Sequence, residues 1–388
     1  MDRLQGPLTA YESPWVNDDV RMFRNTARQF IEKEFVPHQP RWRERRGPDA
    51  AAWAAAGRAG ILLADLPEEY GGGGGTFAHE AVVLEELARA GVHFGSAIQS
   101  TVAHYIMGYG TEAQKRDWIP RLARGESVAA IAMSEPGAGS DLQAIKTSAR
   151  RDGEHYVING SKTFITNGAC ADLVCVAAKT NPKVIGMRGI SLILVEAKDL
   201  AGYRVGRALE KIGMHGQDTV ELFFDEVRVP AANLIGGVEG RGFAQMMEQL
   251  PYERLQIAVG AVAMAEQAVA ITTRYVKERK AFGKPLFDLQ NTRFKLAECR
   301  ANAHVGRVFL DSCIERFLAG RLDDATTAIA KYWLTESQCR IVDECLQLHG
   351  GYGYMTEYPI ARMWVDARVQ RIYAGSNEIM KELIAWSL

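Results

Sequence analysis

The spacing of apolar residues changes twice along this chain, and this change limits the possible folds more than any other feature. Before residue 127 apolar residues recur at helical intervals, and from 127 to about 236 they gather in short runs typical of strands. From 237 to the end the helical spacing returns. Strands that follow one another without intervening helices favour an antiparallel barrel or sandwich. We therefore predict an α+β chain with an all-α domain at 1–126, a β domain at 127–236 and a second helical domain at 237–388.

The first helical region has two notable features. Residues 18–36 place Val20, Phe23, Ala27, Phe30 and Ile31 on one face of a helix, and 76–91 and 111–125 behave similarly. Five consecutive glycines at 71–75 separate two of these helices. No Gly-Lys-Ser/Thr follows the glycines, so the run is interpreted as a flexible loop and not as a phosphate-binding loop.

Charge and cysteine content exclude several classes of function. The 388 residues carry a formal net charge of −1, which gives no general attraction to nucleic acid. The longest apolar runs fall short of the ~20 residues of a membrane span, and the first residues show no signal or transit segment. The six cysteines form no C-x-x-C pair and have no histidine at zinc-ligand spacing, so we expect reduced thiols, no metal and a cytoplasmic location.

Two segments contain candidate functional residues. Residues 131–141, IAMSEPGAGSD, follow an expected strand, and their glycines and hydroxyls could offer donors to a phosphate or a polar heterocycle. They lack the G-x-G-x-x-G pattern of a nicotinamide-binding unit. In the second segment, residues 246–260, Pro251 could occupy the first helical position and Glu253 the third. Glu253 would then be an acid facing the positive end of the helix dipole.

Six segments, taken in order, resemble the motifs of one enzyme family. They read AMSEPGAGSDL, NGSKTFITNG, DTVELFFDEVRVP, ERKAFGKPL, QLHGGYGYMTEYPIARMWVDARV and IYAGSNEIM. Their order and spacing over nearly the whole chain resemble the acyl-CoA dehydrogenases, most closely the long-chain subgroup. The resemblance implies a helical N-terminal domain, a middle antiparallel β-barrel and a C-terminal four-helix bundle. It also implies an oxidoreductase of fatty-acid β-oxidation with bound FAD, assembled as a homotetramer, which passes electrons to an electron-transfer flavoprotein.

The resemblance also assigns cofactor contacts. Residues lining the flavin ring would be Ile131, Met133, Ser134, Gly139, Ser140, Phe164, Ile165 and Thr166. Residues completing the FAD site of a neighbouring subunit, at its pyrophosphate and adenosine, would be Arg279, Phe282, Gln290, Gln347, Leu348, Gly350 and Gly351. Ser376, Asn377 and Glu378 would also contact FAD, and the acyl-CoA would contact Ser140, Arg254 and Gly375.

The family chemistry changes the interpretation of Glu253. The reaction removes a proton from the carbon beside the thioester carbonyl, so it needs a carboxylate base and donors to the thioester oxygen. Many members carry the base in a Tyr-Glu-Gly-Thr segment, where this chain has Ala374, which keeps only its backbone N–H. In a subset that includes the long-chain and isovaleryl-CoA enzymes the base lies in a segment like LPYERL. Glu253 matches that position, so the resemblance makes Glu253 the base and the Ala374 N–H a donor.

Other functions remain open. An acyl-CoA oxidase or a dehydrogenase of carrier-protein thioesters would use the same flavin and base, although oxidases usually have a longer C-terminal region. A non-catalytic flavin- or acyl-CoA-binding protein is the alternative from another class. The sequence is compatible with a medium, a long or a branched acyl chain in the substrate.

Overall fold

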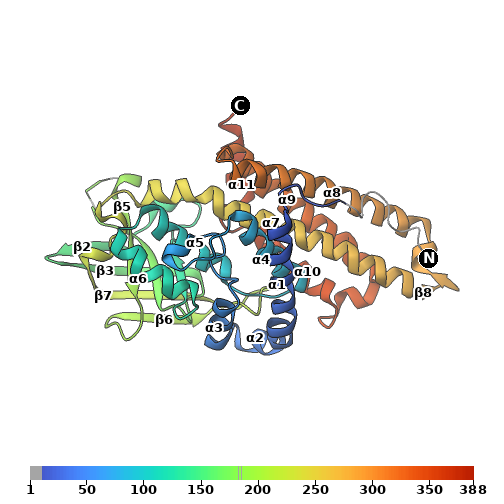
Figure 1. Cartoon of the computed structure of the whole chain (residues 1–388), viewed down its shortest axis with the longest axis horizontal. Helices are drawn as coiled ribbons and strands as arrows, with labels where there is room; N and C mark the ends of the chain where they lie inside the picture. The colour runs from blue at the N-terminus through green and yellow to red at the C-terminus, as the bar shows by residue number, and fades with distance from the viewer. Residues whose placement is uncertain (1–10, 182, 185) are drawn as a thin grey trace.

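One helix, α7 (Gly242–Glu278), runs along most of the molecule, from the β-sheet at one end to a short hairpin at the other (Figure 1). Its 37 residues make it about 55 Å long. The computed structural model describes residues 11–181, 183–184 and 186–388. The predicted order of a helical region, a β region and a second helical region is confirmed.

The described part of the N-terminal region, from residue 11 onward, contains six α-helices, several of which begin at a side-chain cap. Asn17 accepts a hydrogen bond from the Val20 amide at the start of α1, and Thr76 and Thr111 form capping boxes at the starts of α4 and α6. The helices are α1 (Asp18–Phe30), α2 (Gln39–Arg45), α3 (Ala50–Arg58), α4 (Phe77–Ala90), α5 (Ser96–Tyr109) and α6 (Glu112–Ala123).

The glycine run at 71–75 differs from its prediction as a flexible loop. Gly73 and Gly75 donate backbone hydrogen bonds to Leu63 and Ala64, each at 3.0 Å. A Cβ atom at Gly73 would lie 2.8 Å from the Ala64 oxygen. The glycines are therefore needed for a close approach of two backbone segments.

The middle region is a seven-stranded sheet with the order β1-β4-β2-β3-β7-β6, and β5 pairs with β4. Most pairs are antiparallel, as predicted, but β4 runs parallel to both β1 and β2, so the sheet is mixed. The strands are β1 (Ala129–Ala132), β2 (Ser148–Asp152), β3 (His155–Thr166), β4 (Leu173–Lys179), β5 (Ile190–Glu196), β6 (Tyr203–Ala208) and β7 (Thr219–Pro230).

The C-terminal region consists of three long helices with two short helices packed on α9. Beside α7 it contains the hairpin β8 (Lys280–Ala281) and β9 (Lys284–Pro285), α8 (Gln290–Leu318), α9 (Asp324–Leu348), α10 (Pro359–Ala367) and α11 (Asn377–Ala385). Pro251 lies inside α7 and not at its first turn. The interpretation of Glu253 as a helix-start acid is therefore wrong: it lies about three turns inside the helix, where the dipole effect is small.

The apolar cores show how α7 joins the three regions. Its residue Met246 belongs to a cluster that connects α5 and α6 to β1, β4 and β5. Tyr252 belongs to a cluster shared with α1, α3 and α4, and Met264 to the core of the C-terminal helices. A further cluster fills the interior of the sheet.

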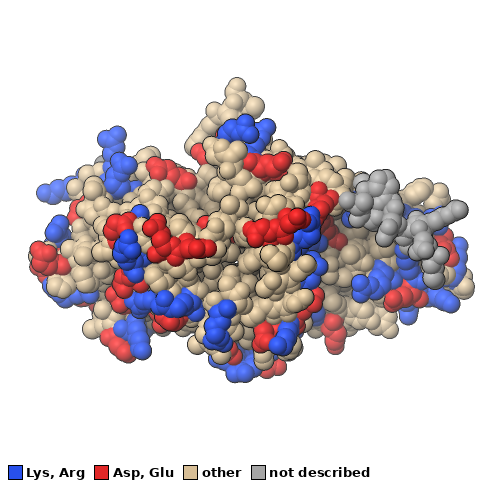
Figure 2. Space-filling model, in the orientation of Figure 1, with Lys and Arg blue, Asp and Glu red and all other residues tan. Residues whose placement is uncertain are grey.

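Two features bear on contacts with membranes or nucleic acids: the charge on the surface and the apolar length of α7. Acidic and basic side chains are interspersed on the face shown in Figure 2. Helix α7 is long and apolar enough to cross a membrane by composition, although no uninterrupted run indicated this in the sequence. However, 67% of its most apolar window is buried against the rest of the protein, as in the core helix of a bundle.

Candidate active site

Glu253 lies on α7 at the junction of the three regions. The Tyr105 hydroxyl of α5 donates a 2.9 Å hydrogen bond to Glu253 Oε1. Burial raises the pKa of Glu253 to about 7, although the Tyr105 hydrogen bond and the charge of Arg254 act in the opposite direction. The side chain keeps some exposure. A partly accessible carboxylate that exchanges protons near neutral pH can act as a general base.

The segment at 131–134 lies close to this carboxylate. Burial, with a contribution from Glu253, raises the pKa of Cys175 on β4 to about 12, and Cys175 is directly opposite Ile131 on β1. Ile131 and Met133 both pack against the apolar cluster that contains Tyr105 and Cys175. The structure therefore brings together two predicted parts of the site, the base and the first residues of the flavin-lining segment.

The turn at Ala374 and Gly375, called the Ala374 turn below, is connected to Glu253 through Arg254, the next residue on α7. The buried Arg254 side chain approaches the Ala374 carbonyl, with Nε 3.5 Å from the oxygen. Lys331 Nζ on α9 donates to the Gly375 carbonyl at 2.8 Å. Two buried cations thus hold consecutive carbonyls of this turn. Burial, together with the charge of Arg254, lowers the pKa of Lys331 to about 7.

The geometry of the turn leaves one donor available. Ala374 and Gly375 both have positive φ, +50° and +87°. Within residues 11–181, 183–184 and 186–388, no group accepts a hydrogen bond from the Ala374 N–H. This N–H can therefore donate to a ligand such as the thioester oxygen.

Three predicted contacts follow directly after this turn. The Ser376 hydroxyl caps α11 by accepting from the Ile379 amide at 3.4 Å. Asn377 is fully buried, and its side chain is bonded to Lys331, Thr335 and Glu336. Its amide is thus committed to α9. Glu378 is exposed.

The segment at 131–141 is fixed by an ion pair that the sequence did not indicate. Lys162 Nζ on β3 lies 2.9 Å from both the Met133 carbonyl and Glu135 Oε1. Glu135 also accepts from the amides of Lys146 and Thr147. Although burial opposes ionisation, the charge of Lys162 and these donors keep the pKa of Glu135 below its usual value. The pair holds β3 to the segment, whose residues Gly139 and Ser140 are exposed and Ser134 is partly exposed.

Residues 164–166 only partly follow the prediction. Phe164 is 70% exposed with φ of +61° at the end of β3, next to a partly exposed Thr166. Ile165 points the other way, into the core of the sheet, because successive strand side chains alternate between faces. The Ile165 side chain therefore faces away from the exposed Phe164, and on that side only the Ile165 backbone is available to a ligand.

A cavity of about 690 Å³ lies at the other end of α7. Arg279 lines it, and its guanidinium lies 5.5 Å from the centre of the Tyr352 ring. A Cβ atom at Gly350 or Gly351 would meet nothing within 4 Å, so the backbone there is open to a ligand. An arginine and accessible glycine backbone suit a pyrophosphate. Of the predicted residues the cavity collects Arg279, Gln347, Leu348, Gly350 and Gly351.

Two predicted residues lie near this cavity but do not line it. Phe282, at the tip of the β8–β9 hairpin, is 91% exposed, and Gln290 is exposed at the first residue of α8. Glu253 and Arg279 are 26 residues apart along α7, which corresponds to about 39 Å. One subunit therefore presents the base and the arginine at two well-separated places.

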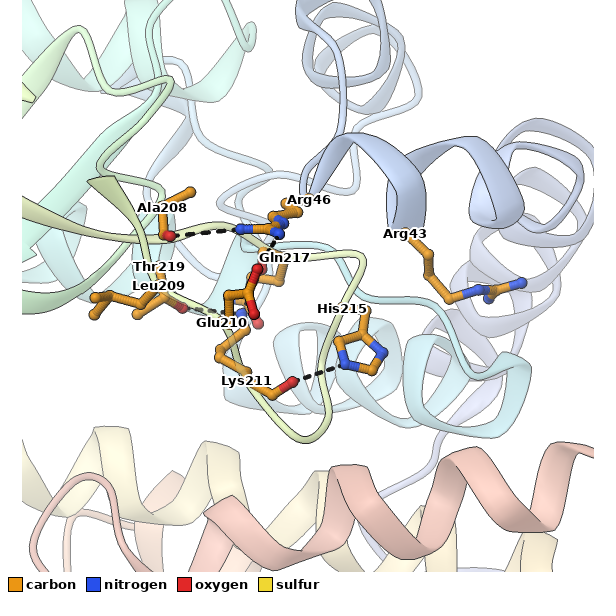
Figure 3. Close-up of a pocket in the computed structure, with 9 residues that line it drawn as sticks. All are labelled: Arg43, Arg46, Ala208, Leu209, Glu210, Lys211, His215, Gln217 and Thr219. Carbon is orange, nitrogen blue, oxygen red and sulfur yellow. Dashed lines mark hydrogen bonds and ion pairs between the residues drawn. The ribbon is translucent and has the colours of Figure 1, made fainter. Parts of the chain in front are cut away.

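A smaller cavity of about 200 Å³ lies between α2 and the loop after β6 (Figure 3). Arg46 donates to the Ala208 carbonyl and pairs with Glu210 at 2.9 Å, and His215 bonds to the Lys211 carbonyl. Figure 3 shows Arg43 directed away from the other side chains. The polar groups that line this cavity pair mainly with one another, so they connect α2 to the loop after β6 and need no ligand.

Comparison with known proteins identifies the family. Models of the N-terminal, middle and C-terminal domains of acyl-CoA dehydrogenase match residues 17–126, 130–227 and 240–388. The chain is 47% identical to the mitochondrial long-chain specific acyl-CoA dehydrogenase of Sus scrofa over 368 residues, covering 94% of this chain and 85% of the relative.

Solved structures agree with the sequence comparison. An acyl-CoA dehydrogenase from Geobacillus kaustophilus superposes with a TM-score of 0.94 at 46% identity, covering 97% of this chain and 99% of that one. A glutaryl-CoA dehydrogenase from Mycobacterium smegmatis in complex with FADH2 has a TM-score of 0.89 at 28% identity, with 96% and 95% covered. The chain belongs to the acyl-CoA dehydrogenase family and is an FAD-dependent oxidoreductase that acts on acyl-CoA.

Proposed function

We propose that this protein converts an acyl-CoA to a trans-2-enoyl-CoA, with Glu253 as the base that removes the α-proton. One observation carries the proposal: a partly exposed carboxylate with a pKa of about 7 lies beside the residue that holds the Ala374 turn. Ala374 itself cannot take a proton, so Glu253 replaces the carboxylate that many relatives carry in this turn.

The residues divide the chemistry as follows. The Ala374 N–H donates to the thioester oxygen and stabilises the negative charge that develops as the α-proton leaves. Glu253 takes that proton, and its raised pKa makes it a stronger base than an exposed carboxylate. Bound FAD would supply the acceptor for the hydride that leaves the β-carbon. Arg254 keeps the Ala374 turn and the base in register, because it follows Glu253 on α7 and bonds to the Ala374 carbonyl.

We further propose that the FAD site is shared between subunits of a homotetramer. Ser134, Ser140, Phe164 and Thr166 hold the flavin of one subunit, and the cavity around Arg279 holds the pyrophosphate and adenosine of a neighbour. The separation of about 39 Å along α7 supports this division.

The substrate and the electron acceptor complete the proposal. Identity of 47% to long-chain specific enzymes supports a long or medium acyl chain, and the small residue at 374 leaves room for a branched chain. An electron-transfer flavoprotein is the proposed acceptor. The six free cysteines fit a reducing compartment such as the cytoplasm. The proposed domain boundaries remain 126/127 and 236/237.

Anaerobic single turnover tests this function. The protein is mixed with butyryl-, octanoyl-, palmitoyl- or isovaleryl-CoA, and flavin bleaching is followed by stopped flow. We expect Glu253→Gln to reduce the bleaching rate by about 10²–10⁴-fold. Glu248→Gln is the matched control, because Glu248 is an exposed carboxylate on the same helix that also accepts from a tyrosine. Near-normal bleaching by Glu253→Gln would refute the assignment of the base.

A further inference from the structure

Helices α5 and α7 are joined by two tyrosine–glutamate pairs. Tyr105 donates to Glu253 at 2.9 Å, and Tyr109, one turn further along α5, donates to Glu248 at 3.0 Å. The two pairs have the same chemistry and join the same helices. They differ in environment. The tyrosine of the inner pair, Tyr105, is fully buried, whereas the glutamate of the outer pair, Glu248, is exposed.

The inner pair leaves the two oxygens of Glu253 unequal. Oε1 accepts from Tyr105, while Oε2 has no hydrogen-bond partner in the described part of the chain. Glu253 is likewise the only partner of the Tyr105 hydroxyl among those residues. Burial, and then the charge of Glu253, hold the pKa of Tyr105 well above 10. The hydroxyl therefore remains a donor at every working pH.

The geometry points to Tyr105 as a positioning residue for the base: it holds Oε1 of Glu253 and leaves Oε2 to take the α-proton. This inference rests on the proposed role of Glu253 and adds a residue from the N-terminal domain to the site. The hydrogen bond orients the carboxylate, which would otherwise rotate freely about its last side-chain bond. The bond also favours the ionised form and so sets the pH at which the base becomes active.

Besides Tyr105, two titratable groups lie near the Glu253 carboxylate, Arg254 and Cys175. Arg254 on the same helix acts in the same direction as Tyr105, and Cys175 on β4 remains neutral because burial and Glu253 raise its pKa to about 12. Tyr105 is thus the only neutral donor to the carboxylate in the described residues. Its removal changes one defined interaction.

The position of α7 does not depend on Tyr105. Tyr252, which precedes Glu253 on α7, bonds to Ser100 at 2.7 Å and to Asp65 at 2.9 Å, and all three side chains are buried or nearly so. This second set of bonds fixes the same turn of α7 to α5. Tyr105→Phe keeps the ring in the core and removes only the hydroxyl, so we expect the variant to fold and bind FAD.

The test compares Tyr105→Phe with Tyr109→Phe. Flavin bleaching by the best acyl-CoA of the panel is measured by stopped flow across the pH range, together with flavin content and thermal stability. The bleaching rate of the parent protein rises with pH as Glu253 ionises. Loss of the hydroxyl destabilises the ionised form of Glu253 and so raises its pKa. We therefore expect this rise to move by about one pH unit toward higher pH in Tyr105→Phe.

The expected pattern is specific to a positioning role. Below the rise Tyr105→Phe should bleach about ten-fold more slowly than the parent, and well above it only the smaller loss that comes from a freely rotating carboxylate should remain. Tyr109→Phe should leave the profile unchanged. A uniform loss at all pH values, or an unshifted rise, would overturn the inference. If Glu253→Gln is inactive while Tyr105→Phe is unshifted, only this inference fails; if Glu253→Gln is active, the proposed base fails as well.

Discussion

Replacement of Glu253 by glutamine should make the protein more stable above neutral pH. Burial raises the pKa of Glu253 from 4.5 to about 7 in the folded protein. The folded state therefore retains a proton that the unfolded chain releases between these values. The stability linked to this proton is complete below about pH 4.5 and is lost as the pH rises through 7.

The size of the effect follows from the shift. A difference of about 2.5 units corresponds to a ceiling of about 3.4 kcal/mol at 1.36 kcal/mol per unit. Glu253 keeps some contact with solvent, which reduces the penalty, so we expect about 1–3 kcal/mol. A neutral glutamine avoids this cost. For a chain of this length the gain corresponds to a rise in Tm of about 1–4 °C.

Thermal unfolding of the FAD-loaded protein without acyl-CoA measures this gain. The difference in Tm between Glu253→Gln and the parent should be positive at pH 8.5 and shrink steadily toward pH 5. Glu248→Gln, whose carboxylate is exposed, should show little change with pH. A lower Tm for Glu253→Gln at high pH, or a difference that does not vary with pH, would refute the electrostatic reasoning.

Three further predictions concern other parts of the molecule. Arg279→Ala should lose flavin on dilution without a comparable loss of folding stability, since alanine offers no fork for a phosphate; unchanged occupancy would contradict this. Ala374→Gly should raise stability by about 0.5 kcal/mol and keep turnover, since glycine accepts the positive φ and retains the N–H; a lower Tm would contradict it. Lys162→Met should cost about 3–5 kcal/mol in denaturant unfolding, because Glu135 is left buried without its cation. The double variant with Glu135→Gln should recover part of this loss, and no recovery would argue against the ion pair.

Strongly periodic segments could be predicted from the sequence, and weakly periodic ones could not. The helix expected at 18–36 buries Val20, Ala27 and Ile31. The strand-like runs VAAIAMS, EHYVING, ADLVCVAAKT, ISLILVEA and VELFFDEVRV overlap β1, β3, β4, β5 and β7 in that order. Strands β2 and β6 were missed because their sequences, SARRD and YRVGRA, are polar and largely exposed. Such strands form because β3 and β7 offer paired partners, which local sequence does not show.

The candidate site divides in the same way. Glu253, Ala374 and Arg279 could be proposed because their motifs are local, but the residues that hold them come from other elements. Tyr105 was missed because helix α5 was not predicted, and its partner lies 148 residues away. Lys331 lies in an apolar stretch of α9, where its partners in the Ala374 turn become visible only in the fold.

The course of α7 through three apolar clusters also limits how this chain can vary. Met246, Tyr252 and Met264 lie on one continuous helix, yet each packs against a different part of the molecule. An insertion or deletion of one residue between them would rotate every later side chain by about 100°. At least one of the three packings would then have to be rebuilt. Loops at the ends of α7 can change in length during evolution, whereas the helix itself must keep its register.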